Sequence, residues 1–192
     1  MTASQIPEPS ASERSGRPGA GKVLLAYFSR AGENYHFGGR RRLEVGNTEV
    51  LAGMIRDRIG CEVYRIEAAD PYSDDYEETV ARNVREQNTD ARPKIARALP
   101  DLDGYPTVLP ASPIWNVRAP MIMTTFAEGL DFTGRTVLPV TTYAMSGLGT
   151  TERDYTASCR GATIGEGLAV QGEKVSASGG DLDGWLRRND LT

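Results

Sequence analysis

The segment Lys22-Val-Leu-Leu-Ala-Tyr-Phe28 is a nearly continuous apolar run. Such a run is typical of a central strand in a parallel sheet, because helices cover both faces of that sheet. Further apolar strand patterns occur at residues 107–111 and 136–141, and segments with helical spacing lie between the strands. Strands that alternate with helices predict a parallel sheet with helices on both sides. We therefore expect a three-layer α/β/α domain.

Weaker patterns complete this arrangement. Shorter strands are predicted at residues 62–66 and 162–168. Asn47 has the properties of an N-cap residue, and Thr151 with Asp154 resembles a capping box. Helices are expected to begin near Asn47, Tyr76, Pro120, Thr151 and Leu182. The residues between the first strand and the first helix are predicted to form a long polar loop.

Length and composition limit the class of protein. A chain of 192 residues suits one domain, and a net charge of −4 gives no electrostatic case for nucleic-acid binding. No run of about 18 apolar residues is present, so no membrane segment is expected. Residues 1–21 are poor in apolar side chains and lack the apolar centre of a secretory signal. We expect them to form a disordered tail ahead of one domain at residues 22–192, in a cytoplasmic protein.

Few residues in the chain can carry acid–base or metal chemistry. Cys61 and Cys159 are the only cysteines, and His36 is the only histidine. A structural zinc site usually needs four Cys or His ligands, so no metal site is expected. His36 lies in a Gly- and Arg-rich segment, which argues against a Ser-His-acid triad. The two cysteines are expected to be buried small hydrophobes rather than a redox pair.

Three loops follow the first, third and fourth strands of the expected sheet. In a doubly wound sheet, ligands bind at the carboxyl ends of such strands. Ser29 leaves the first strand, and the next helix opens at Asn47 and Thr48, whose N–H and hydroxyl groups could hold an anion or could only cap the helix. The other two loops carry Trp115 and Tyr143, which could form the walls of a slot for a flat ligand.

These segments together resemble a known family. Ala26-Tyr-Phe-Ser29 with Gly46-Asn-Thr48, then Ser112-Pro-Ile-Trp115, then Ser146-Gly-Leu-Gly149 is similar to the flavodoxin family, in a bacterial flavodoxin-like branch with an extended phosphate-loop region. The resemblance extends from about Lys22 to about Trp185. It implies a flavodoxin-like, doubly wound five-stranded sheet of order 2-1-3-4-5 and one noncovalently bound FMN.

The resemblance also implies which positions contact the FMN. Ser29, Asn47 and Thr48 would hold the phosphate. Trp115 would stack on the flavin, and Tyr143 is a candidate second ring. Trp115 could instead be an ordinary core residue. Trp185 lies on the apolar face of the last helix and is expected to pack in the core. The cofactor-binding residues implied by the resemblance are Ser29, Asn47, Thr48, Ser112, Pro113, Ile114, Trp115, Asn116, Val117, Thr142, Tyr143, Ala144, Ser146, Gly147 and Gly149.

The sequence departs from the family pattern mainly by an insertion at residues 31–45. Its Arg40, Arg41 and Arg42 could pair with the phosphate or with an acidic partner, or could be a solvated charge run. Its aromatic residues, at positions 35–37, could cap the flavin or only anchor the loop. The insertion could therefore reshape or cover the phosphate pocket.

Three functions remain open at this point. The leading hypothesis is an FMN-binding protein that carries electrons between a reductase and a partner redox protein, as a monomer or homodimer and without a catalytic residue of its own. The alternative is an NAD(P)H-dependent FMN reductase of quinones or other small acceptors. The third is a flavin-free binding domain on the same fold. An acidic segment at residues 70–78 could steer a basic partner, or could simply be the exposed start of a helix.

Overall fold

The structure, a computed structural model, describes residues 22–192. The strands are β1 Val23–Tyr27, β2 Gly32–His36, β3 Gly39–Leu43, β4 Glu62–Arg65, β5 Thr107–Pro113, β6 Thr136–Val137, β7 Val140–Tyr143, β8 Thr163–Ile164 and β9 Leu168–Gln171. The helices are α1 Asn47–Ile59, α2 Tyr76–Asn88, α3 Met121–Glu128, α4 Thr151–Ser158, a 3-10 helix η1 at Gly172–Ala177, and α5 Gly179–Arg188.

All pairings within the main sheet are parallel. β1 lies between β4 and β5. On the other side of β5, β6 pairs with its first half and β7 with its second half, and these are flanked by β8 and β9. The fourth and fifth strands of a five-stranded sheet are thus each broken into two pieces. The predicted order 2-1-3-4-5 is confirmed.

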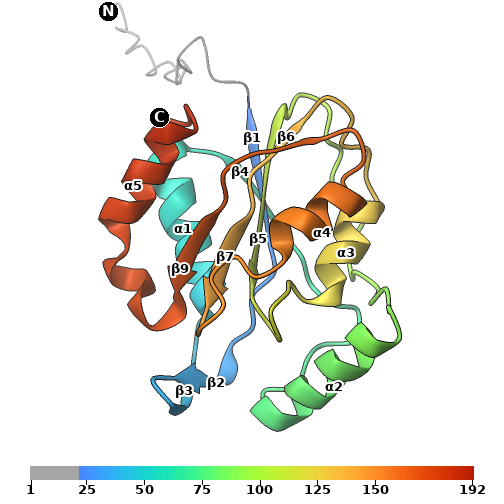
Figure 1. Cartoon of the computed structure of the whole chain (residues 1–192), viewed down its shortest axis with the longest axis vertical. Helices are drawn as coiled ribbons and strands as arrows, with labels where there is room; N and C mark the ends of the chain where they lie inside the picture. Colours follow the sequence, from blue (N-terminus) through green and yellow to red (C-terminus); the bar gives the residue numbers. More distant parts are fainter. Residues whose placement is uncertain (1–21) are drawn as a thin grey trace, which may run out of the picture.

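Two hydrophobic cores lie on opposite faces of this sheet (Figure 1). On one face, Leu25 and Leu109 pack against α1, η1 and α5. On the other face, Leu24 and Val108 pack against α3 and α4. Alternate residues of each strand therefore enter opposite cores, which explains why these strands are apolar throughout. The predicted α/β/α layers are confirmed. Trp185 of α5 is fully buried in one of the two cores, as expected.

The insertion is not the polar loop that we expected. It forms a two-stranded antiparallel hairpin, β2–β3, below the main sheet in Figure 1. Its strands expose polar side chains, so they lack the alternation of apolar and polar residues that identifies a half-buried strand.

Three local predictions were also wrong. The fourth and fifth strands are interrupted, the first of them at Leu138 and Pro139. The N-cap of α1 is Gly46 rather than Asn47, because Ser29 Oγ in the preceding loop accepts a hydrogen bond from Glu49 N. The N-cap of α4 is Thr150 rather than Thr151, whose hydroxyl instead donates to the Leu148 carbonyl.

The expected tail at residues 1–21 lies outside the described residues. Within residues 22–192, no helix combines the length and the apolar character needed to cross a membrane.

Candidate functional site

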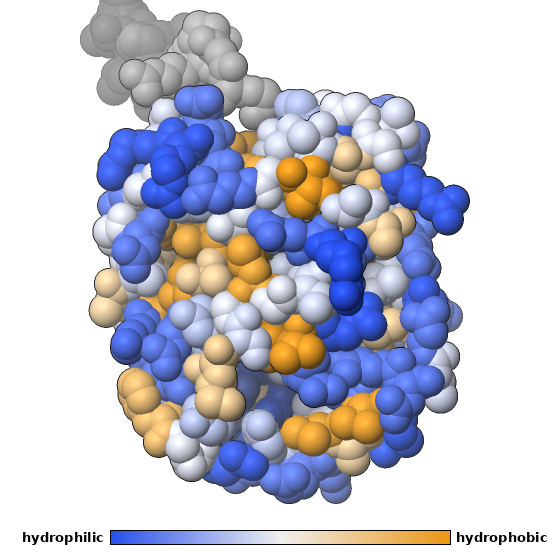
Figure 2. All heavy atoms as spheres, viewed as in Figure 1, coloured by the Kyte–Doolittle hydropathy of each residue, from blue (hydrophilic) through white to orange (hydrophobic). Residues whose placement is uncertain are grey.

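A cleft lies at the carboxyl ends of β1, β5 and β7, the lower edge of the sheet in Figure 1. It consists of two adjoining cavities of about 110 Å³ and about 610 Å³. Both are lined by residues of the first loop, of the hairpin and of α2, together with Ile114, Trp115 and Ala144. Figure 2 shows the surface hollowed at this edge, between the hairpin and α2. The combined volume of the two cavities is in the range of about 300–1,000 Å³ that is usual for small-molecule sites.

The smaller cavity, which we call the polar compartment, lies at the N-terminus of α1. The first N–H groups of a helix have no acceptor inside the helix, and those of Asn47 and Thr48 have none elsewhere among residues 22–192. Ser29 Oγ is held at the same place by its bond from Glu49 N, at 3.1 Å. A side chain at Gly46 would collide with Ser29 Oγ and the Arg30 carbonyl, so this close turn needs glycine. The donors suit an anion such as a phosphate.

Arg30 is the basic residue of the polar compartment. Its guanidinium donates to the carbonyls of Ser73 and Glu33, and its buried Nε has no acceptor in the described part of the chain. Burial lowers the pKa of Arg30 from its ordinary value, because desolvation disfavours the charged form. Arginine nevertheless stays protonated in proteins, so Arg30 adds a positive charge beside the N-terminus of α1.

Thr48 and Thr142 close the inner end of the polar compartment. Their hydroxyl oxygens are 2.7 Å apart, and both side chains are buried. This bond joins α1 to β7, so the two loops that border the compartment are fixed relative to one another. The hydroxyl of Thr48 is therefore already engaged within the protein, whereas its N–H group remains available.

A tight turn at residues 115–118 forms one wall of the cleft. Asn116 and Val117 have φ angles of 50° and 62°, a left-handed conformation that asparagine tolerates but that is strained for a β-branched valine. Trp115 and Arg118 exchange backbone hydrogen bonds across this turn. Strain of this kind persists only where the surrounding structure holds it.

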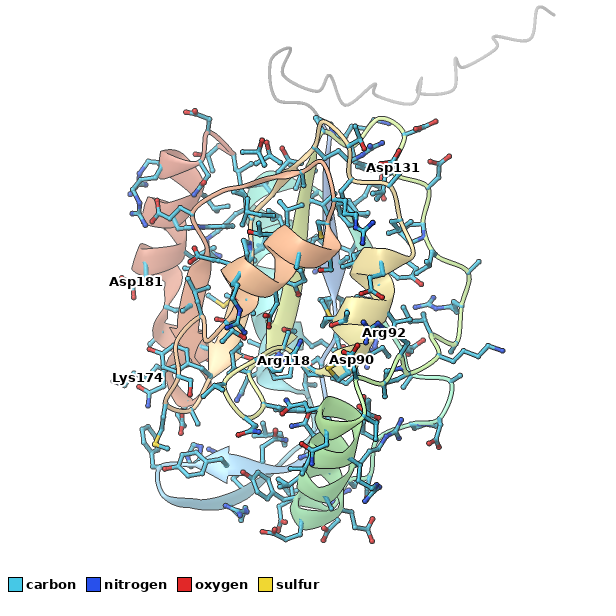
Figure 3. The ribbon with its side chains drawn as sticks, turned by 45° about the vertical axis from the view of Figure 1, so that its right-hand side comes forward. Asp90, Arg92, Arg118, Asp131, Lys174 and Asp181 are labelled. Carbon is cyan, nitrogen blue, oxygen red and sulfur yellow. The ribbon has the colours of Figure 1, made fainter. Side chains whose placement is uncertain are left out.

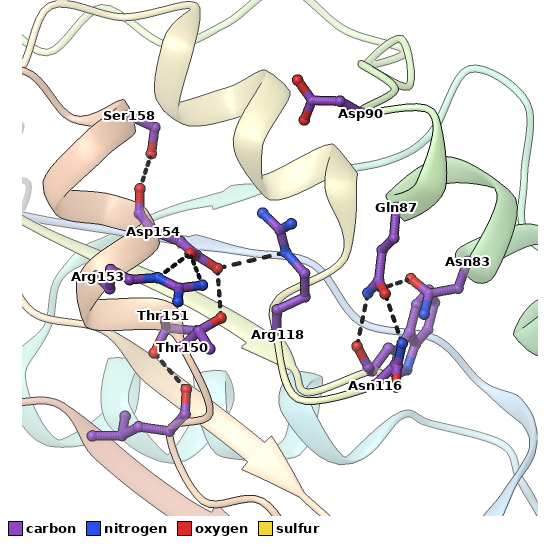
Figure 4. A network of polar contacts seen from close by, with 12 residues as sticks. Asn83, Gln87, Asp90, Asn116, Arg118, Thr150, Thr151, Arg153, Asp154 and Ser158 are labelled. Carbon is purple, nitrogen blue, oxygen red and sulfur yellow. Dashed lines mark hydrogen bonds and ion pairs between the residues drawn. The ribbon is translucent and has the colours of Figure 1, made fainter.

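Side chains on both sides hold this turn, as Figure 4 shows. Gln87 of α2 donates to the Trp115 carbonyl at 3.0 Å and accepts from the Asn116 amide at 2.9 Å. Arg118 lies 3.5 Å from the Asp154 carboxylate at the start of α4. After α2, Asp90 and Arg92 form an ion pair, and Arg92 also binds Glu128 of α3 (Figure 3). α2 and the turn are thereby fixed to the body of the domain.

Trp115 is half-buried and packs on aromatic residues behind it. Its ring meets Phe28 and Tyr72 edge to face, with centroids 5.6 and 5.2 Å away. The indole also lines both cavities. The structure therefore combines the two roles that the sequence left open, because Trp115 joins the edge of the core and borders the cleft. Tyr143, also half-buried, lines the polar compartment.

The hairpin covers the cleft from the outside. Asn34 and Tyr35 line both cavities. At the hairpin tip, Phe37 N donates to the Glu173 carboxylate at 3.1 Å. On the opposite side, Arg40 pairs with Glu77 at 2.9 Å and lies 3.6 Å above the Tyr76 ring. The insertion thus spans the cleft between η1 and α2.

Two of the three arginines of the insertion, Arg40 and Arg42, bind the acidic segment at the start of α2. Arg42 pairs with Asp74, while Arg41 makes no ion pair with any described residue. Asp75 is the N-cap of α2 and accepts a hydrogen bond from Glu78 N. The acidic segment is therefore engaged largely by the chain itself, which weakens its expected role in steering a basic partner.

Most of the predicted site residues meet in this cleft. Those that line it are Ser29, Asn47, Thr48, Pro113, Ile114, Trp115, Asn116, Val117, Thr142, Tyr143, Ala144 and Ser146. Ser112 is buried beneath the loop, and Gly147 and Gly149 lie outside both linings. Gly149 instead packs against the Val117 carbonyl, where a Cβ would collide.

Several lining residues were not predicted as binding residues from the sequence. They are Arg30, Asn34, Tyr76, Thr79, Val80, Asn83, Val84, Met145, Gly172 and Glu173. The valines of α2 follow a helical repeat that was visible in the sequence, but that repeat does not tell which way the helix faces.

Comparisons with known proteins identify the family and the fold of this chain. The family model described as Flavodoxin matches residues 22–189. No protein with a curated description matches the chain. A presumed flavoprotein from Bacteroides uniformis is similar with a TM-score of 0.69 and 27% identity, over 88% of this chain and 99% of the other. One from Bacteroides eggerthii has a TM-score of 0.66 and 26% identity, over 88% and 98%.

A more distant structure shares the fold alone. This flavoprotein from Lactobacillus acidophilus, solved in complex with FMN, has a TM-score of 0.59 and 18% identity, over 82% of this chain and 98% of the other.

Proposed function

The chain belongs to the flavodoxin family, and from that membership we propose that it binds one FMN in the cleft and carries electrons between a reductase and a partner redox protein. The observation that carries this proposal is that three sequence-distant loops line a single cleft at the carboxyl edge of the sheet. The choice of FMN as the cofactor is supported by the flavoprotein of the same fold from Lactobacillus acidophilus, which was solved in complex with FMN.

The polar compartment would hold the FMN phosphate. The N–H groups of Asn47 and Thr48 and the hydroxyl of Ser29 are hydrogen-bond donors at a helix N-terminus. The Arg30 Nε, which is buried and has no acceptor among the described residues, offers a further donor. These groups fit a dianionic phosphate, and the Arg30 charge would offset part of its desolvation.

The flat part of the cofactor would lie between the turn at residues 115–117 and the loop at residues 142–146. Trp115 supplies an aromatic wall, and backbone groups of both loops border the same space. Bound FMN supplies one- and two-electron redox chemistry, and the protein orients it and sets its surroundings.

The lining of the cleft favours a carrier over an enzyme with its own acid–base groups. Among the lining residues there is no histidine or cysteine. The single carboxylate, that of Glu173, binds the backbone of the hairpin tip. A carrier needs no proton donor at a defined position, so the observed residues are sufficient for it.

One observation favours a second candidate, an NAD(P)H-dependent reductase of small acceptors. The larger cavity has a volume of about 610 Å³, against about 110 Å³ for the polar compartment, and Val80 and Val84 of α2 are among its lining residues. A reductase needs such room for a second substrate beside the flavin. Steady oxidation of NADPH by the purified protein with a quinone would favour the reductase, and its absence would favour the carrier.

The test of the proposal is the visible absorption spectrum of the purified protein before and after addition of FMN. Bands near about 370 and 450 nm that stay with the protein through gel filtration would show that it binds the flavin. Reductive titration with a chemical reductant would then count the electrons taken up in each step. A colourless protein that leaves the spectrum of added FMN unchanged would refute the proposal and indicate a flavin-free binding domain.

A further inference from the structure

Tyr72 lies directly behind Trp115 and lines neither cavity of the cleft. The centroids of the two rings are 5.2 Å apart and their planes are inclined at 72°, so the rings are in edge-to-face contact. The indole of Trp115 lines both cavities. Electron transfer between aromatic rings in contact is fast, because its rate falls steeply with distance. An electron lost from Trp115 at the cleft can therefore be replaced from Tyr72.

The hydroxyl of Tyr72 has a proton acceptor already in place. It donates to Glu86 Oε2 of α2 at 2.7 Å, a distance suited to proton transfer. Glu86 is only 9% exposed, and Arg82 Nε donates to its other oxygen at 2.7 Å. The carboxylate is thereby held against the tyrosine before any electron leaves the ring.

Packing alone accounts for the ring contact but not for this carboxylate. Tyr64 of β4 also packs in the core, and its hydroxyl donates to the backbone carbonyl of Ala98. A backbone carbonyl satisfies a tyrosine hydroxyl without the cost of removing a charge from water. At Tyr72 the chain instead places a nearly buried carboxylate, which needs Arg82 to balance it. The arrangement provides a base as well as a hydrogen-bond acceptor.

This base matters when the tyrosine is oxidised. Burial and the hydrogen bond to Glu86 raise the pKa of Tyr72 above its ordinary value, so the phenol is protonated at neutral pH. A phenol that has lost an electron is a strong acid, and its proton then passes to a base within reach. Near neutral pH, a tyrosine that loses its electron and proton together is easier to oxidise than a tryptophan. Transfer of an electron from Tyr72 to an oxidised Trp115 is therefore favourable.

The carboxylate end of this series reaches a second surface. Glu86 and Arg82 line a groove of about 430 Å³ on a face of α2 that does not line the cleft. The Arg82 guanidinium lies 3.9 Å above the Tyr72 ring, so one side chain connects this ring to the groove. Four basic and two acidic side chains line the groove, which favours a small anion there.

We propose that Trp115, Tyr72 and Glu86 form a relay that removes one-electron oxidising equivalents from the cleft. An oxygen-derived radical takes one electron from the Trp115 indole, which keeps its N–H proton, and the radical becomes an anion. Tyr72 then gives one electron to the indole, while its O–H bond breaks and an O–H bond forms at Glu86 Oε2. A small anionic reductant in the groove returns one electron to Tyr72, and the proton returns from Glu86. No step requires FMN, so the relay goes beyond the proposed function.

The test is pulse radiolysis of the full chain without flavin, using azide radicals, which oxidise tryptophan in preference to tyrosine. Trp185 is fully buried, so Trp115 is the indole that azide radicals reach. We expect the absorption of the indolyl radical to decay as that of a tyrosyl radical rises, at a rate independent of protein concentration. Tyr72→Phe keeps the ring and removes the hydroxyl, so it should abolish this conversion.

Tyr64→Phe is the matched control, because the Tyr64 ring contacts Phe126 rather than Trp115. It should leave the conversion unchanged. Conversion that is absent from the unmodified protein, or that persists in Tyr72→Phe, would overturn the relay.

Two measurements test the role of Glu86 as the base. Glu86→Gln keeps an acceptor oxygen for the hydroxyl but is a far weaker base, so the conversion should slow at least about tenfold. The unmodified protein should convert more slowly in D₂O than in H₂O, because the O–H bond breaks in the same step. An unchanged rate in Glu86→Gln, or equal rates in the two solvents, would overturn proton transfer to Glu86.

The groove is tested with ascorbate, a small anionic reductant. Ascorbate should shorten the lifetime of the tyrosyl radical, and Lys94→Glu, which reverses one charge of the groove lining, should lessen that effect. An equal effect in both proteins would overturn the groove as the place of reduction. All these measurements use protein without flavin, so a failure of the proposed function would show separately, as a failure to bind FMN.

Discussion

Ser29 connects the first strand of the sheet to the first helix of the cleft. Its hydroxyl accepts from Glu49 N and lines the polar compartment. It therefore takes part in two interactions, since the same oxygen can cap α1 and donate its own proton to an anion. A residue of this kind links the stability of the helix to the affinity of the site.

Ser29→Ala should therefore affect both quantities. Loss of the cap should lower the free energy of unfolding of the FMN-free protein by about 1 kcal/mol. Loss of the donor should weaken FMN binding by about three- to tenfold, as for a typical hydrogen bond. Chemical denaturation and fluorimetric titration of FMN measure the two effects separately.

Ser158→Ala is the matched control for this substitution. Ser158 also hydrogen-bonds at a helix end, with its hydroxyl donating to the Asp154 carbonyl, but it lies in α4 outside the cleft. It should leave FMN affinity unchanged. Equal FMN affinity in Ser29→Ala and the unmodified protein would contradict the role of Ser29 at the phosphate.

The two cysteines are free thiols, and Cys159 is buried as the sequence predicted, whereas Cys61 is only half-buried. Burial raises the pKa of Cys61 to about 11 and that of Cys159 to about 12, because desolvation disfavours the thiolate. At pH 8 only about one Cys61 side chain in a thousand would then be the reactive thiolate. Neither thiol is therefore suited to redox chemistry near neutral pH.

Reaction with Ellman's reagent should follow this prediction. In the native protein both thiols should react slowly at pH 8, and the rate for Cys61 should rise with pH toward 11, because a raised pKa delays thiolate formation. In guanidinium, where the thiols regain ordinary pKa values, both should react at once. Rapid reaction of native Cys61 at pH 8 would be evidence against its burial.

At the residue scale, the sequence predicted the positions of the loops better than the directions of their side chains. Trp115, Asn47 and Ser29 follow strand ends, and a parallel sheet brings such ends to one edge. Arg30 is next to Ser29 in the sequence, yet its guanidinium is fixed only in the folded chain, by the carbonyls of Glu33 in the hairpin and of Ser73. Ser112 was assigned to the site with its neighbours, but the alternation of strand side chains turns it inward.

The β2–β3 hairpin is the element that distinguishes this cleft. A side chain at Gly32 would collide with Asp74, and Gly32 has a φ of +81°, so glycine permits the close contact between hairpin and α2. Glu33 N also donates to the Asp74 carbonyl at 2.8 Å. The outer strand of the hairpin is held chiefly by Arg40 and Arg42, through pairs that are open to solvent. We infer that the outer strand separates from α2 more readily than the inner one.

The double substitution Arg40→Ala with Arg42→Ala should loosen this attachment. Exposed ion pairs contribute little to stability, so the midpoint of denaturation should barely change. Dissociation of FMN should become faster by about two- to fivefold, because the cover opens more often. Stopped-flow displacement of FMN from the protein measures this rate.

Arg41→Ala removes the same charge from the same strand without breaking an ion pair to any described residue, and it should leave the rate unchanged. High salt should accelerate dissociation more in the unmodified protein than in the double variant, because only the unmodified protein also loses the two ion pairs of the hairpin. Equal rates in the double variant and in Arg41→Ala would contradict the role of the hairpin as a cover.

At the element scale, the main sheet could be predicted from the sequence. The hairpin and the strand breaks could not, because they depend on contacts between distant parts of the chain. The order of strands and the apolar faces of α1, α3 and α5 follow from periodicity and topology. The hairpin was missed because its strands bury no apolar face and depend on contacts with α2. The break in the fourth strand was missed because the apolar pattern continues through Leu138, although Pro139 has no N–H to donate to a ladder.

At the scale of the whole molecule, the cores and the cleft are separate. The two cores fill the faces of the sheet, while the cleft lies at its edge. A ligand can therefore bind there without repacking of the core, and the apo fold should already be complete. Binding should then stabilise the folded state by simple mass action, because the unfolded chain has no comparable site.

This argument gives a prediction for thermal unfolding. At a free FMN concentration of about 100 times its dissociation constant, the free energy of unfolding should rise by about 2.7 kcal/mol. For a domain of this size, the melting temperature should rise by about 5–10 °C. Differential scanning calorimetry with increasing FMN measures both the shift and its dependence on concentration.

Riboflavin at the same concentration separates the two parts of the cleft, because it has the flavin ring but no phosphate. If the polar compartment holds the phosphate, riboflavin should give a clearly smaller shift than FMN. Ser29→Ala should then reduce the shift with FMN and leave the shift with riboflavin unchanged, since Ser29 lines the polar compartment and not the larger cavity. Equal shifts for both flavins in the unmodified protein would show that the N-terminus of α1 contributes nothing to binding, and the assignment of the polar compartment would fall.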